Sequence, residues 1–174
     1  MSVTSITQAE RRLYQRLTVW REDLRDATNF AGFLLKKGWH FDPWDKKIRW
    51  PTYMQQAAFT TALVAAYCRP FVETRNGAVL SMKLAPYTDS ERELHEKLRS
   101  LRTTIYAHSD IELRQVRPAS FNGRATAIVR SPSLKLSRGE TERVLSMIAK
   151  TSKAVDETLQ DLIERVEVSD RGHR

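Results

Sequence analysis

Cysteine is nearly absent from this 174-residue sequence, because Cys68 stands alone. A single cysteine cannot form a disulfide within the chain, which suits the cytoplasm. Metal ligands are equally sparse, since the four histidines are scattered and no pair of carboxylates has a convincing ligand spacing. We therefore expect neither a bound metal nor another cofactor.

Long hydrophobic runs are also missing. Residues 1–12 contain no apolar core of the kind that marks a secretory signal, so no such signal is expected. The most apolar stretch, residues 57–68, is too short and too rich in alanine and threonine to span a bilayer. The sequence predicts a single domain over residues 1–174, with a frayed tail at about 169–174 and no membrane partner.

Basic residues, by contrast, are in excess. The chain has 29 lysines and arginines against 21 acidic residues, a formal net charge of +8. Clustered cations bind polyanions through release of the counterions around phosphates, which favours nucleic acid over a membrane surface as the partner. Solubility alone is an equally weighted alternative, because net charge says little about the fold.

Apolar residues that recur at steps of three and four predict four long helices. Their expected ranges are 6–37, 52–73, 89–108 and about 138–166. Such periodicity indicates an all-α fold, an antiparallel four-helix bundle. The third helix carries an apolar stripe from Leu94 to Ile105, and His95 lies about a quarter turn off that stripe. We therefore expect His95 to be exposed.

Capping signals mark three of the predicted helix starts. A Ser or Thr followed three residues later by Glu or Gln satisfies free backbone N–H groups of the first turn. The pairs are Ser5/Gln8, Thr88/Glu91 and Ser137/Glu140. Gly38 would end the first helix, because glycine readily adopts the left-handed conformation of a helix end. Pro70 should end or bend the second.

A small β-hairpin is predicted between the third and fourth helices, as an insertion at about 111–131. Residues 111–117 and 125–130 alternate like short strands, and Phe121-Asn122-Gly123 between them is typical of a turn. The hairpin arginines, Arg114, Arg117, Arg124 and Arg130, could form a basic flap, and Arg114 and Arg117 are candidates for RNA binding. A solvated strand edge is at least as good an interpretation.

Aromatic residues gather in one loop, residues 38–51, which holds three tryptophans, one phenylalanine and two prolines. Lys46, Lys47 and Arg49 lie among them, an arrangement that can stack bases beside phosphate contacts. The rings can equally cap one end of the bundle, and we favour the cap because large aromatic side chains usually bury.

An arginine and a histidine stand at the end of the third predicted helix. His108 follows Leu101 by seven residues and so falls on the apolar stripe, and Arg102 precedes it by six. Histidine is the side chain best suited to transfer a proton near neutral pH. Arginine holds phosphate oxygens in a bidentate manner and keeps its charge.

The segment Arg102-Thr-Thr-Ile-Tyr-Ala-His108 resembles the Arg-x(4–6)-His motif of the HEPN superfamily of small helical bundles. The resemblance implies a homodimeric, metal-independent endoribonuclease in which two motifs meet across the dimer interface. It also implies a role in host defence, RNA processing or a toxin–antitoxin system, with an antitoxin or defence protein as a further partner. Thr103 stands where many members carry Asn, Asp or His. Asp110 replaces the tyrosine of adenylylated toxins, so adenylylation there is not supported.

RNA cleavage by its own 2′-OH needs proton transfer and charge stabilisation at the phosphate. His108 would supply the first as general acid or base, and Arg102 the second. Supporting groups are Thr103, Tyr106, Ser109 and Asp110, and the candidate RNA-binding cations are Arg99, Arg114, Arg117, Lys46 and Lys47.

Structural alternatives remain for both catalytic candidates. His108 could be a core histidine bonded to a helix-end carbonyl, and Arg102 a surface arginine paired with Glu91 or another acid. Two other function classes follow. One is a non-catalytic helical module that binds RNA, a nucleotide or a protein. The other is a purely structural dimer, which would show no salt-dependent binding of nucleic acid.

Overall fold

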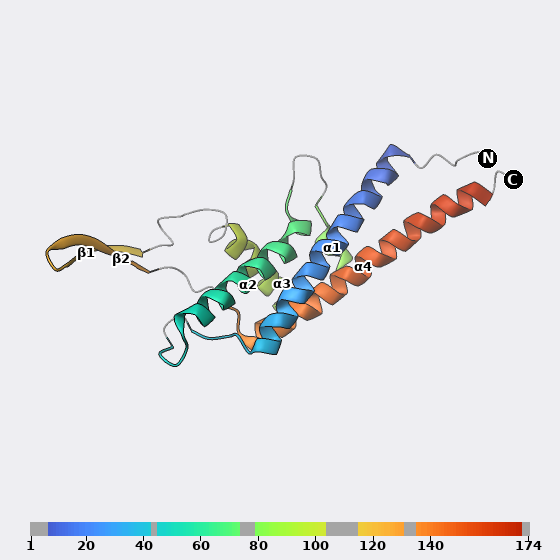
Figure 1. Cartoon of the computed structure of the whole chain (residues 1–174). Coiled ribbons are helices and arrows are strands. Elements are labelled where there is room, and N and C mark those ends of the chain that lie inside the picture. Colours follow the sequence, from blue (N-terminus) through green and yellow to red (C-terminus); the bar gives the residue numbers. More distant parts are fainter. Residues whose placement is uncertain (1–6, 43–44, 74–78, 104–114, 131–134, 172–174) are drawn as a thin grey trace.

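The computed structural model describes residues 7–42, 45–73, 79–103, 115–130 and 135–171. In these ranges it contains four long helices and a two-stranded antiparallel sheet that follows the third helix (Figure 1). The order of elements expected from the sequence is therefore confirmed. The four helices together are called the helical body below.

Helix α1 (Gln8–Lys37) begins with the Thr7/Glu10 capping pair and not with the predicted Ser5/Gln8 pair. Thr7 is its N-cap, and the Glu10 backbone N–H donates to the Thr7 hydroxyl while the Thr7 N–H donates to the Glu10 carboxylate. Both Ser5/Gln8 and Thr7/Glu10 fit the capping pattern, but the carboxylate of Glu10 is the stronger acceptor. The end at Gly38 is as predicted, with φ of 62°.

Helix α4 (Arg138–Arg171) runs antiparallel beside α1, so the two chain ends lie at the same end of the molecule (Figure 1). Its start is the predicted one, because the Ser137 and Glu140 side chains each accept from the other's backbone N–H. It continues past the predicted end at residue 166. Apolar side chains fill the seam between the two helices, from Leu17 to Leu34 on α1 and from Val144 to Leu162 on α4. Each leucine withdrawn from water contributes about 1.5–3 kcal/mol.

Helix α2 (Trp50–Cys68) packs against α1 and α3. The prediction that it reaches residue 73 is wrong: the chain tightens into a 3₁₀ turn, η1 (Arg69–Phe71), at Pro70. Proline lacks the N–H that a continuing α-helix would need there. A second 3₁₀ turn, η2 (Met82–Leu84), precedes α3.

Helix α3 (Asp89–Leu101) packs against α2 and α4 and opens with the predicted Thr88/Glu91 capping box. Past Leu101 the backbone widens into a π-helical form at Arg102 and Thr103. The remainder of the predicted helix, residues 104–108, lies outside the described residues.

The hairpin consists of β1 (Gln115–Phe121) and β2 (Arg124–Arg130), and it projects away from the helical body (Figure 1). Phe121 pairs with Arg124, so the turn is Asn122-Gly123 alone, with φ of 50° and 72°. Positive φ at both positions is the two-residue turn that Asn-Gly favours. The predicted end of the first strand at residue 117 is therefore wrong, because pairing continues to Phe121.

The described residues contain no helix that is both long and apolar enough to cross a membrane.

Candidate RNA site at the end of α3

Arg102 lies where α3 ends. Its backbone N–H donates to the carbonyls of Arg99 and Leu98, and the Thr103 hydroxyl donates to the Arg99 carbonyl at 3.0 Å. These bonds hold the widened turn in place. The Arg102 side chain is half-buried, whereas Thr103 is exposed.

The Arg102 guanidinium lies near the buried Cys68 thiol at the end of α2. Burial raises the pKa of Cys68 to about 12, and the positive charges of Arg102 and then Arg99 oppose that rise. Because the Cys68 thiol is neutral at pH 7, it offers the Arg102 guanidinium no ion pair. Arg99 pairs with Glu96 at 3.3 Å, whereas Arg102 makes no ion pair within the described ranges.

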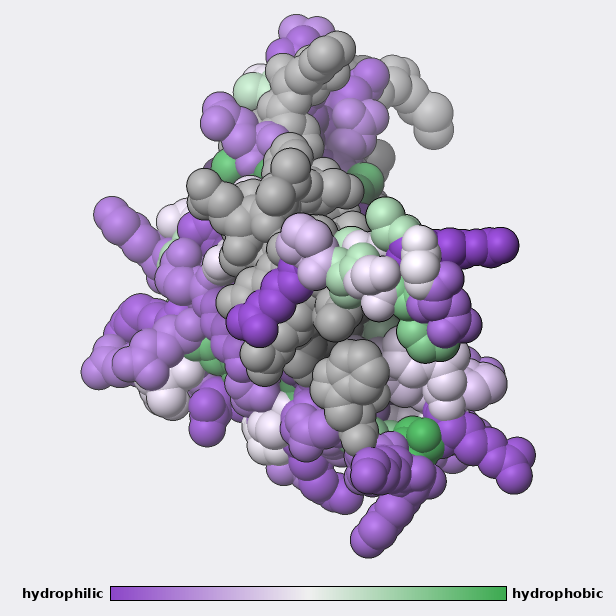
Figure 2. Space-filling view, turned by 90° about the vertical axis from the view of Figure 1, so that its left-hand side faces the viewer, coloured by the Kyte–Doolittle hydropathy of each residue, from purple (hydrophilic) through white to green (hydrophobic). Residues whose placement is uncertain are grey.

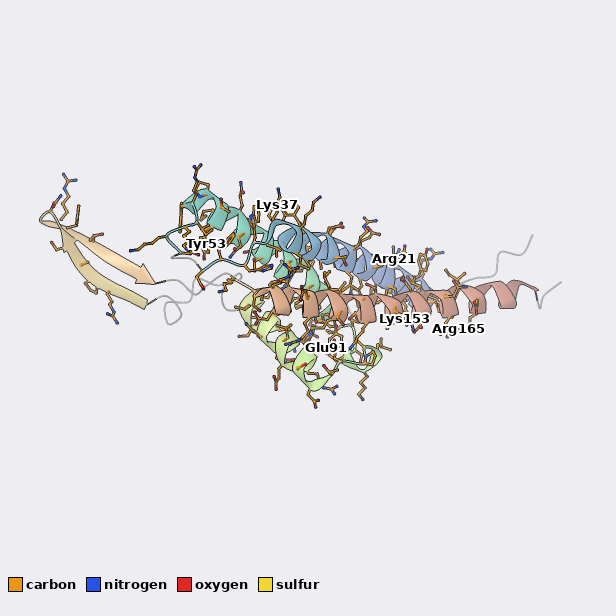
Figure 3. The ribbon with its side chains drawn as sticks, turned by 90° about the horizontal axis from the view of Figure 1, so that it is seen from below. Arg21, Lys37, Tyr53, Glu91, Lys153 and Arg165 are labelled. Carbon is orange, nitrogen blue, oxygen red and sulfur yellow. The ribbon has the colours of Figure 1, made fainter. Side chains whose placement is uncertain are left out.

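Glu91, the sequence-based candidate partner of Arg102, is occupied elsewhere. Lys150 donates to both of its carboxylate oxygens, at 2.7 and 2.9 Å, and the Thr88 N–H donates at 2.7 Å. Figure 3 shows Glu91 at the contact between α3 and α4. Burial raises the pKa of Glu91, but the hydrogen bonds from Lys150 and Thr88 outweigh it, so the pKa lies below its usual value. Pairing of Arg102 with Glu91 is thus wrong.

His95 is buried, and the prediction that it is exposed is wrong. Only 1% of its surface is accessible, its Nδ1 is hydrogen-bonded to the Tyr67 hydroxyl at 2.7 Å, and the Phe71 ring packs against it. The prediction failed because α3 contacts α2 and α4 on two sides, which widens its buried face beyond a single stripe. Burial lowers the pKa of His95 to about 4, so the imidazole is neutral at pH 7.

A chain of buried hydroxyls continues from His95. The Tyr67 and Tyr87 hydroxyls are 3.3 Å apart, and Tyr87 is hydrogen-bonded to the Thr151 hydroxyl and donates to the Met147 carbonyl. Burial raises the pKa of both tyrosines, so they stay protonated. This network joins α2, α3, α4 and the segment before α3. It ties α3 to both of its helical neighbours through His95.

Several predicted site residues cannot be compared with the structure. His108 and the supporting groups Tyr106, Ser109 and Asp110 lie outside the described residues, as does Arg114. The structure therefore describes Arg102 and Thr103 from the predicted catalytic set.

The predicted RNA-binding cations that the structure describes lie on three elements, namely the loop before α2, α3 and β1. Lys46 and Lys47 are exposed in the loop before α2, Arg99 is exposed on α3, and Arg117 is exposed on β1. The hairpin that carries Arg117 stands apart from the helical body (Figure 1). Any RNA that contacts all four would have to extend over several elements.

The aromatic loop divides between the two predicted roles. Trp39 packs edge-on against Phe33 and Phe59, as a cap on the body should, with ring centroids 5.6 and 5.9 Å apart. Trp50 is 58% exposed. The cap interpretation is thus confirmed for Trp39 and wrong for Trp50. Trp44 lies outside the described residues.

Sequence reasoning missed Tyr67 and Tyr87. A signal was present for Tyr67, because a tyrosine within an apolar helix needs a partner for its hydroxyl. No sequence pattern around Tyr87 indicated that its hydroxyl would be buried and hydrogen-bonded, since its partners come from α2 and α4. Across the described ranges, no group of three or more His, Cys, Asp or Glu side chains could hold a metal ion.

Comparisons with protein-family models, with curated proteins and with solved structures return no match. Function must therefore be argued from the residues themselves.

Proposed function

We propose that the protein is a metal-independent endoribonuclease of the HEPN type, in which Arg102 and His108 act on the scissile phosphate. The observation that carries the proposal is the Arg102 guanidinium. It stands at the end of α3, accessible in part, with no acidic partner in the described part of the chain. Its expected structural partner, Glu91, is already bound by Lys150.

The chemistry requires no metal. The ribose 2′-oxygen attacks the adjacent phosphorus, the bond from phosphorus to the 5′-oxygen breaks, and a 2′,3′-cyclic phosphate and a 5′-hydroxyl result. His108 takes the proton from the 2′-hydroxyl or gives one to the leaving 5′-oxygen. Arg102 stabilises the charge on the non-bridging oxygens with its paired N–H donors.

The proposal includes the antiparallel four-helix bundle and a homodimer in which the Arg102 and His108 of two chains share one groove. The packing of α1 against α2 and α4, and of α3 against α2 and α4, supports the bundle. A toxin–antitoxin, defence or RNA-processing role belongs to the same proposal, with the corresponding protein partner.

The test is cleavage of an unstructured RNA with and without EDTA. Wild type should cut equally in both, and His108→Ala and Arg102→Ala should each lower the rate by about a hundredfold or more. Arg92→Ala is the matched control, because Arg92 lies on the same helix, exposed and paired with Asp89 at 3.2 Å. Undiminished cleavage by His108→Ala, or complete loss in EDTA, would overturn the proposal.

A non-catalytic RNA-binding module is the second candidate. The exposed Trp50 beside exposed cations favours it, because such a surface can bind RNA with no chemistry. A binder should tolerate His108→Ala and lose affinity steeply as salt rises, whereas a nuclease should lose its activity.

A further inference from the structure

Trp50, the first residue of α2, is the most exposed tryptophan among the described residues. It is 58% exposed, and among the described residues its aromatic neighbour is Tyr53, with ring centroids 5.4 Å apart and planes tilted by 35°. Tyr53 itself is 8% exposed and anchors the indole from below. Within the part of the chain that the structure describes, the Trp50 ring is thus largely open to solvent.

Met54 extends the same surface. It follows Trp50 by four residues, one helical turn, and is 49% exposed. The opposite side of this first stretch of α2 is buried through Gln56 and Ala57. A flat ring with a flexible thioether beside it can accept a planar group.

Three cations precede the ring. Lys46, Lys47 and Arg49 are exposed and form no ion pair within the part of the chain that the structure describes. Asp45, the nearest acid in sequence, accepts from the Lys47 backbone N–H at 2.9 Å. Some lysines elsewhere are paired, since Lys97 pairs with Glu140 and Lys135 with Asp42. The loop thus keeps an uncompensated positive charge.

Hydrogen bonds hold this loop to the helical body. The buried Gln56 side chain accepts from the Phe41 N–H at 2.8 Å and donates to the Phe41 carbonyl at 2.9 Å. The Ile48 N–H donates to the Asp45 carbonyl at 3.0 Å, and the Tyr53 N–H to the Arg49 carbonyl at 3.2 Å. The described residues of the loop are therefore tied to α2 through Phe41 and Tyr53.

We propose that Trp50, with Lys46, Lys47 and Arg49, binds an unpaired strand of RNA. A base stacks on the open face of the indole, and the cations contact the phosphates on either side of that base. Base stacking on an aromatic side chain contributes about 1–3 kcal/mol, and it works only where the base is free of a complementary strand.

A second copy of this chain fits the surface less well. The end of the molecule at which α2 begins faces the viewer in Figure 2, where the coloured residues show scattered hydrophobic areas among hydrophilic side chains. A stable dimer buries about 1,200–2,000 Å² with a largely apolar centre. Three exposed cations close to one exposed ring in sequence, against the single acid Asp45, match a polyanion better than a like-charged copy.

The choice of RNA rests on the proposed function, but binding at Trp50 does not require cleavage. The probe is a fluorescein-labelled 2′-O-methyl oligouridine of about twelve nucleotides, within the usual site size of single-strand binders. It has no free 2′-hydroxyl, so it cannot be cleaved by the proposed chemistry. Failure of His108→Ala to abolish cleavage therefore leaves this binding result intact, and the two proposals fail separately.

Trp50→Ala should weaken binding of the probe about 5- to 100-fold, and Trp50→Phe, which retains a ring, should keep most of the affinity. The triple variant K46A/K47A/R49A should weaken binding and flatten its salt dependence by about two units of slope. The matched control is R21A/K153A/R165A, which removes the same charge from exposed positions on α1 and α4 (Figure 3). This control should keep the slope within about one unit of wild type.

Three results would overturn the proposal. The first is wild-type affinity in Trp50→Ala, and the second is an equal loss in the two triple variants. The third is a blunt-ended duplex or an oligothymidylate of the same length that binds more tightly than the uridine probe. Folding of every variant is checked by its thermal unfolding, which surface changes at these positions should shift little.

Discussion

The interior of the helical body and the end at which α2 begins use the same residue types in opposite ways. Inside, Lys150 is bound to Glu91, His95 to Tyr67, and Trp39 packs on Phe59. At the end of the body, Lys46 is exposed and forms no ion pair with another described residue. Trp50 is also exposed, and most of its ring is not packed against the described residues. Residue type therefore says little about role. What distinguishes a structural group from a binding group is whether its partners are already supplied.

Glu91→Ala should have the largest effect on the interior side of this comparison. It leaves the Lys150 ammonium, 31% exposed, without its carboxylate and removes a capping contact to Thr88. We expect the free energy of unfolding to fall by about 2–4 kcal/mol, measured by urea titration at neutral pH. Glu142→Ala, which breaks an exposed pair with Arg138, should cost about 0.5 kcal/mol or less. If Glu91→Ala and Glu142→Ala lowered the free energy of unfolding equally, the distinction between interior and exposed ion pairs would be wrong.

The two tryptophans give the most direct internal contrast. Trp39→Ala opens a gap beside Phe33 and Phe59 and should lower the free energy of unfolding by about 2–3 kcal/mol. Trp50→Ala should lower it by about 0.5 kcal/mol or less, because its ring is mostly in water already. Chemical denaturation of both variants measures this. A large loss in Trp50→Ala would mean that the exposed ring is part of the packing.

Tyr67→Phe tests the buried hydroxyl network. It leaves His95 Nδ1 and the Tyr87 hydroxyl each without one partner, at a cost of about 1–3 kcal/mol in unfolding free energy. Tyr14→Phe is the control, since Tyr14 is 43% exposed, and its loss should stay within about 0.5 kcal/mol. The account of α3 fails if the two variants unfold at the same urea concentration.

The smallest expected effect is a pH dependence. The folded-state pKa of His95, about 4, lies below its ordinary value of 6.5, so the unfolded chain binds the proton more readily. Stability is then complete above about pH 6.5 and falls as the pH drops toward 5, by roughly 1 kcal/mol per unit. Glu91 and Glu140, whose pKa values are lowered, add their losses only below about pH 4.5.

His95→Gln provides the control for that measurement, because its side chain stays neutral throughout. Urea titrations between about pH 7 and 5 should show the slope in wild type and a much flatter profile in the variant. A slope that survives in His95→Gln would assign it to another group.

Periodicity and capping chemistry predicted most of the fold. The Thr88/Glu91 and Ser137/Glu140 boxes and the Gly38 end depend on residues three or four apart, so the sequence contains them in full. The Asn122-Gly123 turn is local in the same sense. Contacts between residues far apart in the sequence could not be predicted from such local patterns. The burial of His95 depends on α2 and η1, and the pairing of Glu91 with Lys150 spans 59 residues.

The candidate site was predictable only in part. The sequence placed Arg102 on the third helix, but six residues before its predicted end, and it did not predict the separation of Trp39 from Trp50. Both tryptophans lie in one aromatic loop region, and only the fold of that loop against Phe33 and Phe59 determines which ring is covered.

The central claim is that the guanidinium of Arg102 acts with His108 on an RNA phosphate. End-group analysis of an RNA cut in EDTA tests it most directly, with wild type, Arg102→Ala, His108→Ala and the control Arg92→Ala side by side. The account predicts 2′,3′-cyclic phosphate and 5′-hydroxyl ends from wild type and from Arg92→Ala, and none from the other two. Products with 3′-hydroxyl ends, or cyclic ends that persist in both site variants, would contradict it.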